Sequence, residues 1–284
     1  MVAESRQEML ARRERQANLI RQRIMTTLQA AGTGHVGGSL SAADILTALY
    51  FQVLRVDSKN PQWEDRDRFV LSKGHASAAL CPVLAEAGFF PCDLLSTFNQ
   101  LDSPFAVHPD MLKIPGVDMS TGSLGHGLAV GLGMALAARV RGKSYRTFIL
   151  LGDGELCEGS VWEAAMAAAH YRVDSLTAIV DRNRLMVDGS TAEVMEIEPL
   201  GDKWRAFGWT VREIDGHDMA ALVDTLSSVP FETGRPSVII AYTIKGKGLP
   251  FAENRVEWHY HDVDQETVER SLAVLKAQPP GERR

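Results

Sequence analysis

A carboxylate and an amide stand in matching positions of the sequence, each just after an apolar run. Asp153 follows the run 147–151, and Asn183, 30 positions further on, follows the run 176–180. Both runs are typical of fully buried parallel strands, so the two side chains are expected at the carboxyl edge of one sheet, where open α/β folds bind ligands. Their oxygens suit Mg²⁺, which keeps other positions open for phosphate oxygens and water. The pattern predicts a site for a metal-bound diphosphate.

Ordinary turn chemistry explains either half of this pattern alone. Gly152-Asp153-Gly154 can form a β-turn, and Asn183 can cap a helix or a turn. Turn chemistry does not explain both halves at equivalent strand ends. The two glycines also let the backbone approach a phosphate closely. The metal-diphosphate interpretation is therefore preferred.

Five of the eight histidines fall in predicted loops. Loops at the carboxyl side of a parallel sheet converge on one crevice, where neutral imidazoles can donate and accept protons near pH 7. Any one of them alone is better explained as a surface residue or a turn hydrogen bonder. Zinc is disfavoured, because His259 and His261 form the only close pair in the sequence and no His-Glu-x-x-His motif occurs. The five are His35, His75, His108, His126 and His259.

Composition and net charge exclude some classes of function. The 284 residues are 45% apolar and carry a formal net charge of −6. This much apolar sequence supports one α/β domain over residues 1–284, with a polar tail, 278–284, that is expected to be disordered. A negative chain is a poor partner for nucleic acid, because binding to a phosphate backbone needs a basic surface.

Cysteine usage and hydropathy indicate a cytoplasmic protein. Cys81, Cys92 and Cys157 form no Cys-x-x-Cys motif and are odd in number, so neither a disulfide framework nor a thiolate zinc site is expected. The N-terminus lacks the apolar core of a signal peptide, and no apolar run reaches the length of a membrane span. We expect no membrane partner.

The rest of the pattern supplies the elements that would position these residues. Ser5 and Glu8 form a capping box that opens a helix ending before Gly32, and a loop is expected through 34–38. Residues 102–124 show no periodicity, and long ordered loops are usually functional. The alternation of strands and helices predicts an α/β fold, a doubly wound, mostly parallel sheet with helices on both faces. Strands are expected at 69–72, 147–151, 176–180, 209–214 and 237–243, and further helices from about 41 and at 76–87, 125–141, 160–171, about 200–207, 218–228 and about 265–276.

The Asp153 and Asn183 motif resembles the metal-binding signature of thiamine diphosphate enzymes. In those enzymes the Asp, the Asn and a backbone carbonyl two residues further on hold a divalent ion. The resemblance implies that Asp153, Asn183 and the carbonyl of Leu185 hold Mg²⁺, with Ca²⁺ or Mn²⁺ as substitutes. It also implies that thiamine diphosphate is the cofactor.

The loop motifs make the resemblance more specific, because they follow the order seen in transketolases. The match extends over about residues 15–265. The matching segments are Gly34-His35-Val36-Gly37-Gly38-Ser39, Ser72-Lys73-Gly74-His75, His108-Pro109-Asp110, Pro115-Gly116-Val117, the segment 120–127, and Gly152-Asp153-Gly154 with Glu158-Gly159.

This resemblance implies a role for each matched residue. The roles concern the diphosphate, the sugar, the aminopyrimidine ring and a second active site. His35, His75 and His259 match histidines near the diphosphate and the sugar hydroxyls; His108 matches one that contacts the C1 hydroxyl of the donor; Gly122 and Leu124 match the segment against the cofactor; Gly154 matches a backbone contact on the aminopyrimidine side; and Glu158 matches an acidic residue that links two active sites across a dimer interface.

The chain departs from the family pattern at three places. Val36-Gly37-Gly38 stands where many transketolases have Pro-Gly-Xaa, His126 stands where Gln is usual, and Ala76 replaces a common Gly. These differences affect the expected substrate more than the cofactor, because the Asp153 and Asn183 pair is intact.

The resemblance covers only the first of the three domains of a single-chain transketolase. The activating glutamate of the family, and most arginines that hold sugar phosphates, belong to the part that is absent here. The resemblance implies the N-terminal subunit of a split transketolase, active with a separate C-terminal subunit, with two copies of each chain as the expected assembly. Such an enzyme transfers a two-carbon ketol unit from a ketose or its phosphate to an aldose or its phosphate. Which sugar is used stays open, and sulfonated and branched sugars are included.

Three other interpretations remain. A deoxyxylulose-phosphate synthase would share the first loop and the metal motif but lack the block at 115–125. The E1 alpha subunit of a 2-oxoacid dehydrogenase is also a separate chain, but it lacks this array of histidines. A non-catalytic scaffold that binds a magnesium nucleotide would need only Asp153 and Asn183.

Overall fold

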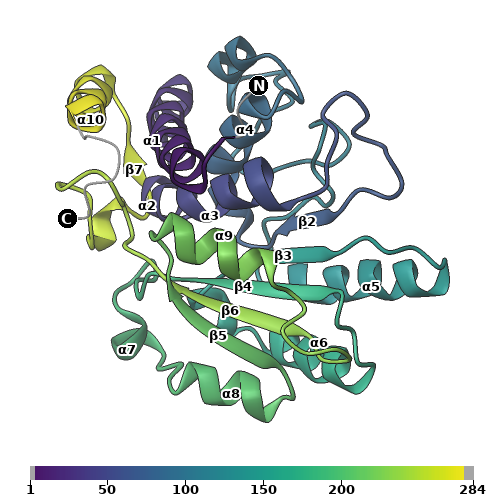
Figure 1. Ribbon diagram of the computed structural model, residues 1–284. Helices are drawn as coiled ribbons and strands as arrows, with labels where there is room; N and C mark the ends of the chain where they lie inside the picture. The colour runs from purple at the N-terminus through teal and green to yellow at the C-terminus, as the bar shows by residue number, and fades with distance from the viewer. Residues whose placement is uncertain (1–3, 278–284) are drawn as a thin grey trace.

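A computed structural model describes residues 4–277 of the chain. Five strands form one sheet, all parallel, in the order β2-β3-β4-β6-β5 (Figure 1). They coincide, within a residue or two, with the five strands expected from the sequence, so the expected parallel α/β sheet is confirmed. Their bounds are β2 Arg68–Leu71, β3 Thr147–Gly152, β4 Leu176–Arg182, β5 Thr210–Asp215 and β6 Ser237–Tyr242.

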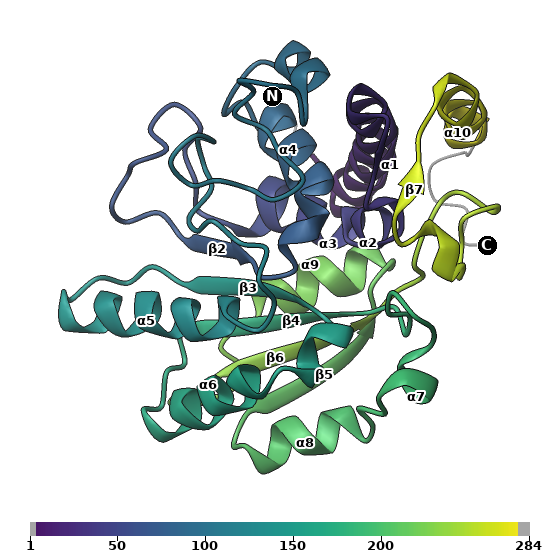
Figure 2. The same ribbon diagram turned by 180° about the vertical axis from the view of Figure 1, so that it is seen from behind.

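Helices cover both faces of the sheet, as the doubly wound arrangement requires. On one face lie α1 (Arg6–Ala31), α3 (Ala43–Ala48) and α9 (Met219–Ser227). On the other lie α5 (Gly127–Val140), α6 (Gly159–His170) and α8 (Leu200–Ala206), which are in front in the reverse view (Figure 2). In β3, Phe148 and Leu150 belong to the first core, whereas Ile149 and Leu151 belong to the second. Successive strand residues point to opposite faces, so a continuous apolar run fills two cores.

The remaining elements surround the carboxyl edge of the sheet or flank it. A second, two-stranded antiparallel sheet joins β1 to β7, near the two ends of the described chain. Five short helical turns lie at 49–53, 74–76, 92–97, 154–157 and 256–258. The other bounds are β1 Thr33–Gly34, α2 Val36–Ser41, α4 Ser77–Glu86, α7 Thr191–Val194, β7 His261–Asp262 and α10 Gln265–Ala277.

The prediction of a loop through 34–38 was wrong, because α2 begins at Val36. Every residue of that helix is buried. Glycine disfavours a helix by about 1 kcal/mol relative to alanine, so two adjacent glycines indicated a loop. Packing overrides this preference here. A Cβ atom on Gly37 would lie 2.8 Å from the Cγ atom of Lys245 and 2.9 Å from the carbonyl oxygen of Trp258. The helix forms where only a residue without a side chain fits.

Other expectations about the chain have mixed outcomes. Residues 102–124 contain no helix or strand, as expected. Cys81, Cys92 and Cys157 are free thiols. Among residues 4–277, no helix combines the length and apolar character needed to cross a membrane. The single domain over 1–284 stays a prediction, and the tail 278–284 lies outside the described residues.

Candidate active site

The carboxylate of Asp153 lies at the turn that carries Asn183. The last residue of β3 pairs with Asp181 of β4, so the two chain segments leave the sheet side by side. Asp153 Oδ2 accepts a hydrogen bond from the backbone N–H of Arg184 at 2.5 Å, and Asn183 Oδ1 accepts one from the N–H of Leu185 at 3.1 Å. Asp153 is 2% exposed and Asn183 is 6% exposed. The shared carboxyl edge expected from the sequence brings the predicted metal ligands to one turn.

A buried arginine supplies the counter-charge of Asp153. The Nη1 atom of Arg182 lies 3.1 Å from Asp153 Oδ2 and 2.8 Å from Thr191 Oγ1, and its other donors contact Glu198. Burial raises the pKa of Asp153, and the nearby charge of Asp181 raises it further, whereas the contacts with Arg184 and Arg182 act in the opposite direction. Asp153 is thus an acidic group in a poorly solvated place, and its charged form needs a cation close by.

The ammonium group of a buried lysine contacts two backbone carbonyls of the same turn. Lys245 is 2% exposed, and its Nζ atom lies 2.9 Å from the carbonyl oxygen of Leu185 and 3.2 Å from that of Met186. Nζ also donates to Nδ1 of His259 at 2.8 Å. Burial, and secondly the charge of Lys73, lower the pKa of Lys245 to about 8. The backbone carbonyls at this turn therefore already attract a positive charge.

The donor set fits a hard divalent ion rather than zinc. Within residues 4–277, no group of three or more His, Cys, Asp or Glu side chains is arranged to hold a metal. The oxygen donors gathered at the turn are one carboxylate, one amide and one backbone carbonyl, from Asp153, Asn183 and Leu185. Oxygen ligands in this small number suit Mg²⁺, which takes its remaining ligands from water and phosphate.

Four of the five loop histidines gather into one group, which we call the histidine cluster. The ring centroid of His35 lies 5.1 Å from that of His75, 5.5 Å from that of His259 and 6.3 Å from that of His108. His75 and His259 are 5.5 Å apart. His126 is exposed at the start of α5 and takes part in none of these ring contacts. The expected convergence is therefore found for four histidines.

Three members of the histidine cluster, His35, His75 and His259, have lowered pKa values. Burial first, and then the neighbouring His108 and Lys245, lower the pKa of His35 to about 4. Burial and Lys245 lower the pKa of His259 to about 3, and burial holds the pKa of His75 well below its usual value. Neutral imidazoles can both accept and donate a proton. The Nδ1 atom of His35 is buried and has no hydrogen-bond partner among the described residues, which is unusual for a buried polar atom.

Two glycines bring the loops close together. A Cβ atom on Gly74 would lie 2.6 Å from the backbone carbonyl carbon of Thr121. One on Gly122 would lie 3.0 Å from the His108 ring. Glycine is therefore required at position 74, because any side chain there would push the turn at 72–75 away from the segment 121–122, and at position 122 a side chain would press on the His108 ring.

A buried glutamate anchors the other end of this segment. Glu155 is 2% exposed and accepts hydrogen bonds from the backbone N–H groups of Gly125 at 2.9 Å and Gly152 at 3.0 Å, and from the Ser72 hydroxyl. Leu124, matched to the cofactor-facing segment, directly precedes this anchor. The end of β3 and the loop after 120 are thereby held in one arrangement.

The two remaining predicted residues lie on the short helical turn after β3. The N–H of Gly154 donates to Asp153 Oδ1 at 2.8 Å, so this turn is tied to the predicted metal ligand. Glu158 is exposed and precedes the first residue of α6. Its exposure leaves it available to another chain.

Several residues that shape the site had no role assigned from the sequence. Lys73 is 1% exposed, and its Nζ atom lies 2.5 Å from Asp181 Oδ2 and 2.8 Å from the Gly38 carbonyl. Lys73 and Asp181 both lie in motifs identified in the sequence, so they could have been singled out. Lys245 follows an apolar strand without a recognisable motif, and only the fold brings it to the turn at Leu185.

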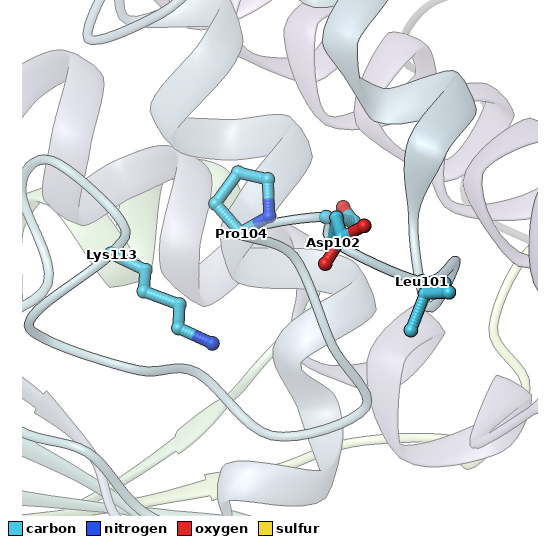
Figure 3. A pocket seen from close by; sticks show the side chains of 5 residues that line it. Leu101, Asp102, Pro104 and Lys113 are labelled. Atoms are coloured by element: carbon cyan, nitrogen blue, oxygen red, sulfur yellow. The ribbon is translucent and has the colours of Figure 1, made fainter.

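The long loop also forms a hollow of about 640 Å³ on the surface (Figure 3). None of its lining residues belongs to the histidine cluster. Leu101, on its rim, is 94% exposed. The hollow is lined by Leu101, Asp102, Ser103, Pro104 and Lys113.

The fold and this edge of the sheet define a thiamine diphosphate-binding domain of the transketolase type. The family model described as "Transketolase, thiamine diphosphate binding domain" matches residues 12–279. The chain therefore belongs to the transketolase family, and the expected cofactor, thiamine diphosphate, agrees with that description.

Relatives that match along nearly their whole length include proteins named as transketolase subunits. The chain is 44% identical to the 6-deoxy-6-sulfo-D-fructose transketolase subunit SqwG of Clostridium sp. (strain MSTE9), covering 93% of this chain and 96% of that one. It is 42% identical to an apulose-4-phosphate transketolase subunit of Phocaeicola vulgatus, covering 91% and 92%. These relatives confirm the expectation of a transketolase N-terminal subunit.

Solved single-chain transketolases share the fold but are longer. The transketolase of Leishmania mexicana superposes with a TM-score of 0.87 at 31% identity over 95% of this chain. The match spans only 42% of the Leishmania chain.

Proposed function

We propose that this chain works with a separate C-terminal subunit to transfer a two-carbon ketol unit from a ketose to an aldose. The observation that carries the proposal is the position of the histidine cluster beside the turn of Asp153 and Asn183, joined to it by the contact between His259 and Lys245. A diphosphate site at this turn and a set of imidazole groups would thus share one edge of the sheet. A bound thiamine diphosphate would supply the electron sink for cleaving the carbon–carbon bond.

The metal ligands we propose are Asp153 Oδ, Asn183 Oδ1 and the Leu185 carbonyl, with Mg²⁺ as the ion and Ca²⁺ or Mn²⁺ as substitutes. This set is supported by the hydrogen bonds that hold both side chains at one turn and by the ammonium group on the Leu185 carbonyl. A divalent ion there would neutralise a diphosphate in a buried place.

The histidine cluster would handle protons and hydroxyl groups. The proposed catalytic residues are His35, His108, His259 and Glu158, of which the three imidazoles can exchange protons with sugar hydroxyls. The cofactor would be contacted by His75, Gly122, Leu124, Gly154, Asn183 and His259. The buried, unpartnered Nδ1 atom of His35 supports this division, because a buried polar atom without a partner costs free energy until a ligand satisfies it.

A second polypeptide would complete each site. The solved transketolases are more than twice as long as the matched region, and relatives of matching length are named as subunits. Glu158 is exposed at the start of α6, where it would link two sites between copies of this chain. We therefore propose two copies of each chain. We also propose a cytoplasmic location, on the three free cysteines.

The test is reconstitution with the candidate second subunit. Thermal shifts would be recorded with thiamine diphosphate, ADP and Mg²⁺, with each chain alone and with both, followed by turnover of ketose donors including sugar phosphates and a sulfonated ketose. We expect stabilisation by thiamine diphosphate with Mg²⁺ and ketol transfer only with both chains. Stabilisation by ADP but not by the thiamine cofactor would contradict the enzyme and favour a nucleotide-binding scaffold. Turnover of 2-oxoacids in place of ketoses would indicate an E1-like or deoxyxylulose-phosphate synthase-like subunit.

A further inference from the structure

The small sheet of β1 and β7 places Tyr260 directly opposite His35. In this antiparallel pair, Thr33 is matched with Asp262 and Gly34 with His261. The next residue along β1 is His35, and the preceding residue on the other strand is Tyr260. Hydrogen bonds beyond this pair support the register, since Thr33 Oγ1 donates to the His261 carbonyl at 3.0 Å and the Val263 N–H donates to the Gly32 carbonyl at 2.8 Å. The two side chains are therefore held together by backbone geometry.

The rings of Tyr260 and His35 are in contact. Their centroids lie 4.8 Å apart with an interplanar angle of 82°, an edge-to-face arrangement. The chain around Tyr260 is anchored on both sides, because the ring of Trp258 stacks on that of His261 at 4.0 Å and 26°. Trp258 is itself only 9% exposed. Tyr260 is thus firmly placed at the border of the histidine cluster.

The polar end of Tyr260 is unused by the described residues. The side chain is 49% exposed, and none of the hydrogen bonds found within residues 4–277 involves its hydroxyl group. Next to it lies the ring of His35, whose Nδ1 atom is buried and also lacks a partner. The Tyr260 hydroxyl, which can donate and accept, is therefore available beside that ring. An uncharged, hydroxyl-bearing carbon chain can form hydrogen bonds with such a group.

We propose that Tyr260 contacts the hydroxyl-bearing part of the sugar substrate and helps to determine which ketose is used. This inference rests on the proposed ketol transfer. Its phenol group would hydrogen bond to a sugar hydroxyl, and its ring would limit the space beside His35. Tyr260 would act on the substrate and not on the cofactor diphosphate, which lies at the Asp153 and Asn183 turn.

The chain contains a matched control. Tyr171, at the end of α6, is 53% exposed and packs edge-to-face on His170, with centroids 4.9 Å apart at 78°. It has nearly the same exposure and the same kind of ring contact as Tyr260, but neither Tyr171 nor His170 belongs to the histidine cluster. Substituting Tyr171 measures the effect of losing a half-exposed tyrosine away from the site.

The experiment uses the reconstituted two-chain enzyme with thiamine diphosphate and Mg²⁺. For the wild type and for Tyr260→Phe, Tyr260→Ala and Tyr171→Phe, kcat and KM are measured over ketose donors that differ in length and in the configuration of their hydroxyls, and the cofactor Kd is measured by fluorescence quenching. Loss of one hydrogen bond to an uncharged group predicts a fall in kcat/KM of about 2- to 12-fold for Tyr260→Phe on the preferred ketose. Tyr260→Ala should change the ratio of kcat/KM between donors, and the cofactor Kd should stay within about twofold of wild type.

Two results would overturn the inference while leaving the proposed function intact. One is wild-type kcat/KM for every ketose in both Tyr260 variants. The other is a pattern of nonspecific damage, either an equal loss of kcat/KM for all donors or weaker binding of the cofactor. Such a pattern would mean that Tyr260 only holds His35 in place. A wild-type enzyme that binds thiamine diphosphate but turns over no ketose would contradict the proposed function itself, and the inference would fall with it.

Discussion

The ammonium nitrogen of Lys245 lies 2.9 Å from the carbonyl oxygen of Leu185, the same oxygen that the resemblance to thiamine diphosphate enzymes assigns to a metal ion. A cation and an ammonium group cannot share this oxygen without strong repulsion, so Lys245 has to move away when a divalent ion binds. Its charge would then be available to an anionic ligand.

The first prediction concerns this lysine. We expect Lys245→Met to bind Mn²⁺ more tightly than wild type when no thiamine diphosphate is present, because the competing charge is gone, and to bind thiamine diphosphate more weakly. Mn²⁺ titrations followed by electron paramagnetic resonance and calorimetry with the cofactor would measure the two effects. The exposed Lys113→Met serves as the control. Unchanged affinities for both ligands would show that Lys245 does not interact with the site.

The second prediction is for Asp153. We expect Asp153→Ala to weaken Mg²⁺-dependent binding of thiamine diphosphate by more than about 100-fold, since even partners of metal ligands are worth roughly 10- to 100-fold. Calorimetry with and without Mg²⁺ would measure it. Asp188 lies exposed in the segment after the turn, so Asp188→Ala is a control that should bind normally. Retained metal-dependent binding in Asp153→Ala would rule out the metal assignment.

The third prediction separates substrate from cofactor. In the two-chain enzyme, His108→Ala should lower kcat on a ketose while leaving the cofactor Kd nearly unchanged, because His108 is the exposed member of the histidine cluster. A general acid or base contributes about 10²- to 10⁴-fold, which sets the size of the loss. Steady-state kinetics and fluorescence quenching measure the two quantities. Comparable losses in turnover and in cofactor affinity would assign His108 to the cofactor instead.

The fourth prediction concerns acid stability. The folded-state pKa of His35 is lowered to about 4 and that of His75 lies well below 6.5, so the unfolded chain binds these protons first. The stability contributed by the neutral rings is present above about pH 6.5 and is lost as the pH falls toward 4. The free energy of unfolding, measured with urea from pH 7 to pH 4.5, should fall less steeply with pH for His35→Gln than for wild type. For His126→Gln it should fall with the same slope as for wild type. Equal slopes for His35→Gln and wild type would contradict the role of burial.

The fifth prediction concerns the buried ion pair of Lys73 and Asp181. Asp181 is fully buried, and Asp181→Asn leaves the Lys73 ammonium group without its counter-charge. Breaking such a pair costs about 3–5 kcal/mol of unfolding free energy. Urea unfolding would measure this loss, and Asp224→Asn, at an exposed ion pair with Arg6, should cost less than about 1 kcal/mol. A loss below about 1 kcal/mol for Asp181→Asn would show that the pair is unimportant for stability.

The sheet could be predicted from the sequence because its central strands are continuous apolar runs between turns. Phe148 to Leu151 has no polar residue, and burial on both faces is what such a run requires. Once the strands were predicted, the carboxyl edge of the sheet could be predicted too, and with it the positions of Asp153 and Asn183. The convergence of His35, His75, His108 and His259 was expected from the same rule about loops at the carboxyl side.

The helix α2 and the position of Lys245 could not be predicted, for a common physical reason. Gly37 and Gly38 disfavour a helix locally, and only the packing of Lys245 and Trp258 against Gly37 shows why the helix forms. The contact of Lys245 with Leu185 joins residues 60 positions apart through strands that are adjacent in the sheet. Neither fact leaves a periodic signal in the sequence.

The pairing of β1 with β7 makes the beginning of the domain depend on its end. A frameshift just before His261 would remove the strand paired with Gly34, and with it α10, whose Val268 and Leu275 are buried in the same core as α1. Damage late in the gene would thus release His35, which lies near the start of the chain.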